Sequence, residues 1–242
     1  MSALLHVDDL QKRYGSLRAL DGFSLDAERG KLTGLIGPNG AGKTTAFACI
    51  SGATKPSAGS VVFDGNPIAG RPYHRVAHLG IARTYQVVQT FAEMTVLEAV
   101  TVGALMRRRR LADARAHADA TIAFVGLAAK RDILGKSLTI ADKKRLEVAR
   151  ALATEPALLL LDEVMAGLTP AEAQSAVALL RAILDRGITI VMVEHVMEVL
   201  MPIADHVVVL SAGRTIFSGS AGAAANDPAV IEAYLGPPLG QA

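Results

Sequence analysis

The sequence holds a single cysteine, Cys49, in 242 residues, so no internal disulfide is possible. A reducing compartment fits this, and we interpret Cys49 as a core residue. The N-terminus lacks the basic start and long apolar run of a signal peptide. Apolar runs are also short: the clearest, residues 157–161, ends at Asp162, whereas a membrane-spanning helix needs about 20 apolar residues. We therefore expect a soluble or peripheral protein rather than an integral one.

A surplus of one charge is missing too, since the formal net charge is +2. Proteins that bind nucleic acid usually concentrate a basic surplus on one face, so we expect no nucleic-acid partner. The four arginines at residues 107–110 we interpret as a solvated helix face or a patch facing phospholipid. What is abundant is apolar: 51% of the residues, enough for one large core or a core plus a small lobe.

Short apolar runs bounded by polar residues or glycine predict strands on both sides of a helical middle. The predicted strands are residues 4–7, 23–25, 32–36, 60–63, 81–85, 157–161, 188–193, 207–210 and 215–217. Helices are predicted between them at residues 43–51, 169–186, 196–203 and 227–234. This alternation favours a largely parallel sheet covered on both faces.

The middle of the chain carries helical patterning and no convincing strand. Thr95 and Glu98 have the spacing of a capping box, which satisfies free backbone N–H groups at a helix start. We expect that helix to run into residues 107–110, with further helices at 112–124 and 141–153. The chain is thus predicted to be one domain, residues 1–242. Its core would comprise about 1–89 and 154–242, with a helical lobe inserted at about 90–153.

A glycine-rich segment after the strand at residues 32–36 fits the phosphate-binding P-loop pattern, in the required place before a helix. The glycines let backbone N–H groups turn toward phosphate oxygens, and the helix N-terminus adds partial positive charge. Lys43 is placed to reach the β- and γ-phosphates, and the Thr44 hydroxyl to bind Mg²⁺. We assign the following residues to nucleotide binding: Gly37, Pro38, Asn39, Gly40, Ala41, Gly42, Lys43, Thr44 and Thr45.

Two carboxylates, Asp162 and Glu163, follow four leucines at the end of a predicted buried strand. Ligands of parallel sheets gather at the carboxyl ends of the strands. Asp162 would hold Mg²⁺ directly or through water, and Glu163 would act as general base on the attacking water. The plainer alternative is an acidic pair that merely begins a loop.

In this order, the motifs of residues 5–235 resemble the ATP-binding subunits of ABC transporters. The resemblance implies an α/β fold of the P-loop NTPase class, with a mixed sheet core, an N-terminal antiparallel β part and an inserted α-helical lobe. It also implies that Tyr14 stacks on adenine and that Gln86, in Ala-Arg-Thr-Tyr-Gln, senses Mg²⁺ and the attacking water. His195, in Val-Glu-His, would contact the γ-phosphate. Considered one at a time, each of these three residues could instead be an ordinary structural residue with no role in nucleotide binding.

Within that family, Gly-Ile-Ala-Arg-Thr-Tyr-Gln, Glu-Met-Thr-Val-Leu-Glu and Ile-Glu-Ala-Tyr-Leu-Gly are similar to the branched-chain amino acid importers. The resemblance implies ATP and Mg²⁺ as cofactors and a peripheral position on the cytoplasmic face of the membrane. It implies permease subunits, a second ATPase subunit (identical or paralogous) and, indirectly, a solute-binding protein as partners. Two alternatives stay open: a soluble ABC-type ATPase not tied to transport, and a nucleotide-dependent dimerisation switch with little turnover.

The segment Leu-Thr-Ile-Ala-Asp at residues 138–142 departs from the family's Leu-Ser-Gly-Gly-Gln signature. The resemblance implies that Thr139 and Ala141 contact the partner subunit's nucleotide. Thr139 also heads a predicted helix as its cap. Asp142 adds a charge that would repel phosphate, and we expect Lys143, Lys144 or Arg145 to neutralise it. Smaller departures are Val164, where proline is common, and Thr169, which a helix cap explains.

Overall fold

The computed structural model describes residues 3–84, 92–194 and 197–235. Among these residues, six strands form one sheet in the order β10-β9-β3-β8-β7-β6. Only β10 runs antiparallel to its neighbour, which confirms the mixed sheet. Every residue of β3, β7 and β8 is buried, which explains their mostly apolar sequences. The strands are β3 (Leu32–Ile36), β6 (Ile81–Arg83), β7 (Leu158–Asp162), β8 (Thr189–Val193), β9 (His206–Ser211) and β10 (Arg214–Gly219).

A second, antiparallel sheet has the order β2-β1-β4-β5. Its first strands are longer than predicted because register shifts, as between Val7 and Leu10, interrupt the alternation of apolar and polar residues. The bounds are β1 (Ala3–Tyr14), β2 (Leu17–Glu28), β4 (Ala58–Phe63) and β5 (Asn66–Pro67). Helix α1 (Lys43–Ile50) shares a core with both sheets. Cys49 lies in that core, and burial raises the pKa of its thiol to about 11, as expected of a packing residue.

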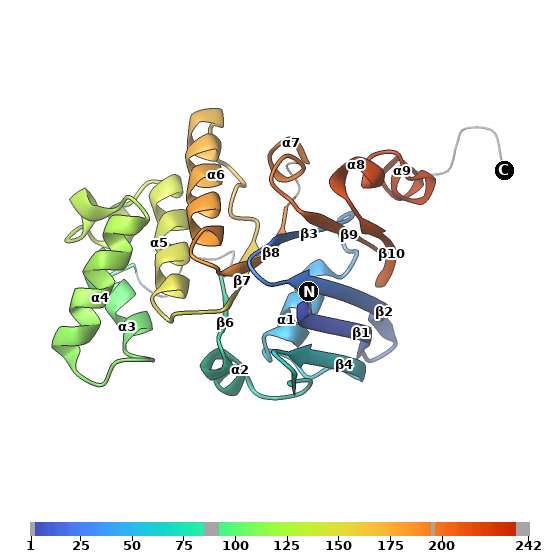
Figure 1. Cartoon of the computed structure of the whole chain (residues 1–242), viewed down its shortest axis with the longest axis horizontal. Coiled ribbons are helices and arrows are strands. Elements are labelled where there is room, and N and C mark those ends of the chain that lie inside the picture. Colours follow the sequence, from blue (N-terminus) through green and yellow to red (C-terminus); the bar gives the residue numbers. More distant parts are fainter. Residues whose placement is uncertain (1–2, 85–91, 195–196, 236–242) are drawn as a thin grey trace.

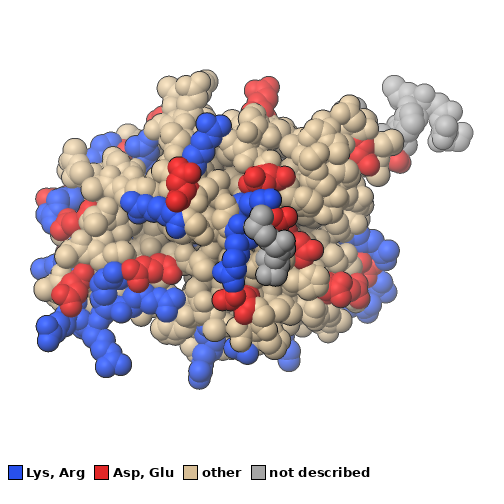
Figure 2. Space-filling model, in the orientation of Figure 1, with Lys and Arg blue, Asp and Glu red and all other residues tan. Residues whose placement is uncertain are grey.

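Helices α3 (Val96–Ala104), α4 (Leu111–Phe124) and α5 (Ile140–Leu152) gather at one end of the molecule (Figure 1). The Thr95–Glu98 capping box is confirmed. The helix it starts ends at Ala104, however, so the predicted extension into residues 107–110 is wrong. Those arginines form the turn before α4, because Arg107 bonds the Thr154 carbonyl and Arg108 pairs with Glu155. Figure 2 shows basic side chains gathered on this end of the molecule.

The remaining helices cover the six-stranded sheet. Figure 1 shows α7, α8 and α9 on one side of it and α1 with the antiparallel sheet on the other. Helix α2 was not predicted, because only Val76 of its residues is buried and no apolar stripe is visible. The predicted helix at residues 196–203 is shorter in the structure. The bounds are α2 (Tyr73–Leu79), α6 (Pro170–Leu184), α7 (Met197–Leu200), α8 (Ala221–Ala224), α9 (Pro228–Leu235), and the 3₁₀ turns η1 (Ala128–Lys130) and η2 (Gly135–Ser137).

Among the described residues, no helix has the length and apolar character needed to cross a membrane. The division of the chain into a core and an inserted lobe stays a prediction.

Candidate nucleotide-binding site

Parallel strand ends bring the predicted motifs together. β8 lies between β3 and β7, so the residues after β3, β7 and β8 share one edge of the sheet. Asp162 at the end of β7 is level with Val193 of β8, and Val193 is level with Leu35 of β3. The P-loop follows β3 directly, and Glu163 follows Asp162. This edge is where ligands of parallel α/β sheets bind.

The P-loop glycines take backbone conformations that other residues rarely adopt. Gly37, Gly40 and Gly42 have φ of 151°, 79° and 110°. A Cβ at Gly37 would lie 2.0 Å from the Leu210 carbonyl oxygen, and one at Gly42 would lie 2.5 Å from that of Ala19. At Gly40 a Cβ would meet no atom within 4 Å. The loop is thus packed against the protein at both ends, and at Gly40 it faces open space.

Lys43 is folded into this loop. Its ammonium donates to the Gly37 carbonyl at 2.7 Å and to the Pro38 carbonyl at 3.0 Å, and the residue is 6% exposed. Burial lowers the pKa of Lys43, and the nearby carboxylates of Glu163 and Asp162 partly offset this. The ammonium therefore bonds the loop carbonyls within electrostatic range of the two acidic residues. Thr44 follows in the first turn of α1 and is exposed, and Thr45 is half-buried.

Asp162 is held from two directions by the end of β6. The Arg83 guanidinium donates to Asp162 Oδ2 at 3.0 Å, with both side chains 5% exposed. The Asp162 backbone N–H donates to the Thr84 hydroxyl at 3.1 Å. Arg83 was not among the site residues predicted from the sequence. The feature that could have identified it is an arginine within an apolar strand, since a buried arginine normally requires a charged partner.

Glu163 has a left-handed backbone, with φ 51°, which is uncommon for a residue with a side chain. Its N–H donates to the Val193 carbonyl at 3.0 Å, and its own carbonyl accepts from the Lys144 ammonium on α5. The buried Glu194 carboxylate accepts the N–H of Met165 at 2.7 Å and so holds the loop that follows. Unfavourable backbone conformations of this kind are concentrated at functional sites.

For three other predicted site residues, the predicted role in the site stays a prediction. Tyr14 ends β1 and is 48% exposed, with the Lys12 ammonium 4.7 Å from the centre of its ring. A stack of that ring on adenine stays a prediction. Gln86 and His195 lie outside the described residues, so their predicted roles also stay predictions.

The altered signature segment starts a capped helix, as predicted. The Thr139 hydroxyl accepts the N–H of Asp142 at 3.2 Å and donates to its carboxylate at 2.6 Å. The prediction that Lys143, Lys144 or Arg145 neutralises the Asp142 carboxylate is wrong, because Asp142 pairs with Lys130 from η1. Burial raises the pKa of Asp142, but hydrogen bonds from Lys130 and Thr139 outweigh it and hold the pKa below its usual value.

The three predicted partners of Asp142 are directed elsewhere. Lys144 bonds the Glu163 carbonyl, and Arg145 donates to the Ser175 hydroxyl at 2.7 Å. The Lys143 side chain makes no hydrogen bond or ion pair among the described residues. In Figure 1, α5 lies beside α6 and apart from α1. Within one chain, the structure therefore does not bring Thr139 and Ala141 to the P-loop.

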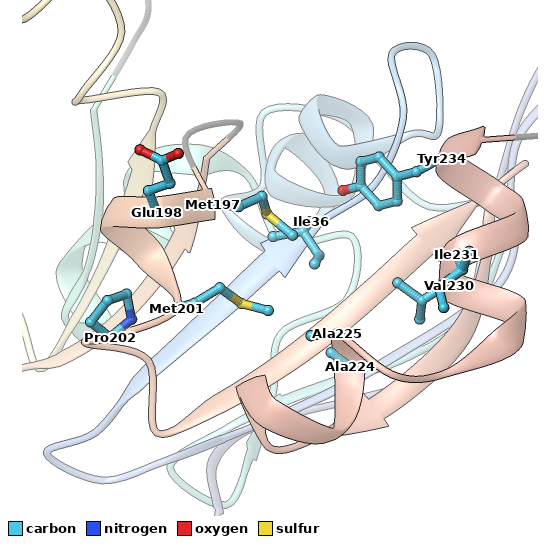
Figure 3. A pocket seen from close by; sticks show the side chains of 10 residues that line it. All are labelled: Ile36, Met197, Glu198, Met201, Pro202, Ala224, Ala225, Val230, Ile231 and Tyr234. Carbon is cyan, nitrogen blue, oxygen red and sulfur yellow. The ribbon is translucent and has the colours of Figure 1, made fainter.

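An apolar hollow of about 430 Å³ lies between α7, α8 and α9, next to Ile36, the residue before the P-loop (Figure 3). The Tyr234 ring of α9 points toward Met197 and Ile36 across it. Burial raises the pKa of Tyr234, against the effect of the Gly37 backbone N–H, which lies at its hydroxyl. Helix α9 thus reaches the first residue of the loop.

These residues fit a nucleotide with a divalent cation. The loop faces open space at Gly40, its lysine is buried beside two carboxylates, and an exposed hydroxyl from Thr44 follows. Backbone N–H groups, an ammonium and a helix N-terminus suit phosphate, whereas hydroxyl and carboxylate oxygens suit Mg²⁺.

Comparison with known proteins agrees with this geometry. A family model described as "ABC transporter" matches residues 20–166, more than half of the chain. The chain belongs to the ABC transporter family. Its fold is that of the ATP-binding cassette, the ATPase unit that this family couples to transport. One solved ABC transporter cassette, in its ADP conformation, has a TM-score of 0.89 and 29% identity, with 98% of this chain and 100% of that chain covered.

Two relatives of this cassette differ in what they transport. The high-affinity branched-chain amino acid transport ATP-binding protein BraF of Pseudomonas aeruginosa is 35% identical, over 96% of this chain and 98% of BraF. The lipopolysaccharide export system ATP-binding protein LptB of Haemophilus influenzae is 32% identical, over 97% of this chain and 98% of LptB. Both alignments span whole cassettes.

Proposed function

We propose that this cassette is the ATP-hydrolysing subunit of an importer for branched-chain or related amino acids. The observation that carries the ATPase site is the buried Lys43 ammonium, held in the P-loop beside Asp162 and Glu163. The likeness to BraF supports amino-acid import. Lipopolysaccharide export, the activity in LptB's name, is the competing assignment for the transported solute.

Catalysis in this site is mainly positioning and electrostatics, as in other phosphoryl transfers. The backbone N–H groups of residues 37 and 39–45 and the Lys43 ammonium bind the phosphates of ATP, and Tyr14 stacks on the adenine. The Thr44 hydroxyl and the Asp162 carboxylate hold Mg²⁺, which when bound neutralises charge on the phosphates. The Glu163 carboxylate orients and polarises the attacking water. Gln86 and His195 complete the site around the γ-phosphate.

A complete site requires a second ATPase subunit, identical or paralogous. Two subunits would pair head to tail, so that Thr139 and Ala141 of one contact the nucleotide of the other. The pair works with permease subunits at the cytoplasmic face of the membrane, and through them with a solute-binding protein.

A nucleotide-dependent dimerisation switch is the second candidate, and one observation favours it. The Thr139 hydroxyl already donates to Asp142 at 2.6 Å. A hydroxyl engaged in this way has no proton left for a phosphate oxygen. The bond would weaken the contact between this segment and a nucleotide, and therefore favour slow turnover.

Steady-state ATP hydrolysis by the purified chain, measured across protein concentration beside Glu163→Gln, separates these functions. The proposal predicts a rate per subunit that rises with concentration and disappears in the variant, which still binds ATP. Full hydrolysis by Glu163→Gln would exclude Glu163 as the base. ATP binding and dimerisation without hydrolysis, even with the permease present, would favour the switch.

The solute is tested separately in vesicles that hold the complete transporter. ATP-dependent uptake of a radiolabelled branched-chain amino acid supports the importer. Export of lipopolysaccharide without amino-acid uptake contradicts it.

A further inference from the structure

Arg83 and Asp162 form a buried ion pair at the edge of the sheet where the nucleotide site lies. Arg83 Nη2 lies 3.0 Å from Asp162 Oδ2, and each side chain is 5% exposed. The two residues are 79 positions apart in the sequence but sit on neighbouring parallel strands, β6 and β7. Next to Arg83, the Thr84 hydroxyl accepts the backbone N–H of Asp162. The end of β6 thus holds both the side chain and the main chain of Asp162.

The same guanidinium touches two other parts of the protein. It lies 5.7 Å from the ring centre of Phe47, on the helix that follows the P-loop. It also lines a hollow of about 210 Å³ between α2, α3 and α5, together with Gly103, Met106 and Arg150. Because the side chain is 5% exposed and its guanidinium lies against the Phe47 ring, the arginine has little freedom to follow a moving carboxylate. The orientation of Asp162 is therefore fixed by contacts outside the nucleotide site.

We propose that Arg83 is a positioning residue that fixes the Asp162 carboxylate for a divalent cation bound with ATP. This inference rests on the proposed function. Outer partners of metal-binding carboxylates orient the ligand atoms, and their loss typically weakens metal binding about 10- to 100-fold. Mg²⁺ depends on such orientation because it demands near-ideal octahedral geometry, whereas Ca²⁺ accepts flexible arrangements of oxygen ligands.

A role in orientation and a role in charge predict different results. If Arg83 acted only through its positive charge, its removal would change Mg²⁺ and Ca²⁺ affinity in the same direction and by similar factors, because both cations carry two charges. If it orients the carboxylate, its removal weakens Mg²⁺ binding far more than Ca²⁺ binding. The ratio of the two affinities is thus the deciding quantity.

The experiment is isothermal titration of ATP into wild type and Arg83→Met, once with Mg²⁺ and once with Ca²⁺. We expect Arg83→Met to weaken ATP binding about tenfold with Mg²⁺ and by no more than about twofold with Ca²⁺. Arg83→Lys, which keeps a charged donor, should recover part of the lost Mg²⁺ preference. If the ratio of Mg²⁺ to Ca²⁺ affinity stays at the wild-type value, because ATP binding changes equally or not at all with the two cations, the inference is overturned.

Arg150→Met is the matched control. Arg150 lines the same hollow but pairs with Glu147 instead of Asp162. We expect this variant to keep the wild-type ratio of Mg²⁺ to Ca²⁺ affinity. A change in Arg150→Met as large as in Arg83→Met would mean that any disturbance of the hollow is enough, and would also overturn the inference.

Removal of one partner from a buried ion pair is strongly destabilising, so thermal unfolding is recorded for each variant. If Arg83→Met does not fold, Arg83→Gln carries the test, because its side chain stays polar but is too short to reach Asp162 as the guanidinium does. The same rule applies: Mg²⁺ binding must weaken more than Ca²⁺ binding, and an equal change contradicts the proposal. A wild type that binds no ATP with either cation would instead refute the proposed function.

Discussion

The Lys144 ammonium on α5 donates a hydrogen bond to the main-chain carbonyl of Glu163, 19 residues further along the chain. On its other side, the Glu163 N–H donates to the Val193 carbonyl. A left-handed backbone at a residue with a side chain costs on the order of 1–3 kcal/mol unless its surroundings maintain it. These two bonds maintain it at Glu163. The helix that begins at the altered signature segment is thus in direct contact with the proposed general base.

Replacement of Lys144 by methionine should lower turnover while ATP binding is kept. Without the ammonium, the Glu163 peptide loses one support, and small misplacements of a catalytic group lower rates by about tenfold or more. We expect kcat to fall by about that factor and ATP affinity to change by less than about twofold. Lys143→Met is the control, since the Lys143 side chain makes no hydrogen bond or ion pair among the described residues. Equal losses in both variants would contradict a specific role for Lys144.

Alanine at Gly37 and at Gly40 should differ sharply in stability. Both glycines have positive φ, so each substitution introduces backbone strain of about 1–2 kcal/mol. A methyl at Gly37 would also lie 2.0 Å from the Leu210 carbonyl oxygen, whereas one at Gly40 meets nothing within 4 Å. We therefore expect Gly37→Ala to lose about 3 kcal/mol or more, or to fail to fold. Urea unfolding of both variants measures the difference, and similar losses would show that the loop is not packed as described.

Substitution of Asp142 by asparagine should reduce stability in a pH-dependent way. The pKa of Asp142 is lower in the folded chain than its ordinary value of 3.8, so its stabilising effect is present above that pH and is lost as pH falls through the folded value. We expect Asp142→Asn to lose about 1–2 kcal/mol at pH 7, through its bonds to Lys130 and Thr139. The loss should become smaller as pH falls below 3.8 and through the pKa of the folded state.

The measurement for Asp142 is urea unfolding of wild type and variant from pH 3 to pH 8. Asp113→Asn is the control, because Asp113 is exposed in the first turn of α4. Its substitution should change stability by less than about 0.5 kcal/mol at any pH. A loss in Asp142→Asn that stays constant over the whole pH range would contradict the ion pair as its cause.

Thr169 should prove to be a helix cap without a part in catalysis. Its hydroxyl accepts the N–H of Glu172, whose carboxylate in turn accepts the N–H of Thr169. Thr169→Ala should lose about 1 kcal/mol of stability, and Thr169→Ser, which keeps the oxygen, much less. ATP hydrolysis per folded molecule should stay at the wild-type level in both. A lower kcat in Thr169→Ser would assign Thr169 a role beyond the cap.

Local patterns predicted the parts of the fold that depend on near neighbours in sequence. The capping boxes at Thr95 and Thr169 were predicted because their partners lie three residues away. The buried strands β3, β7 and β8 were recognised because burial on both faces makes most positions apolar. Sequence patterns did not predict elements in which buried residues do not recur at regular intervals. Bulges hid the length of β1, and α2 buries too little to show a stripe.

Charged partners were the hardest to predict, because a charge pairs with whatever the fold brings near. Asp142 has three basic residues directly after it, yet Lys130 from a separate turn neutralises it. Lys143 and Lys144, at i+1 and i+2, point away from Asp142 on the helix, whereas Arg145, at i+3, bonds the Ser175 hydroxyl instead. The turn at residues 107–110 has the same explanation, since Thr154 and Glu155 fix two of its arginines across 47 positions.

The sequence alone determined the nucleotide chemistry, because the P-loop needs glycines, lysine and threonine at set spacings and so carries its own geometry. It also determined that Asp162 and Glu163 follow a buried strand. Only the tertiary structure decided how those carboxylates are held, with Arg83 of β6 on Asp162 and Lys144 of α5 on the Glu163 peptide. The physical reason is that these contacts join segments 79 and 19 residues apart. Strand order and helix packing set such contacts, and no local spacing encodes them.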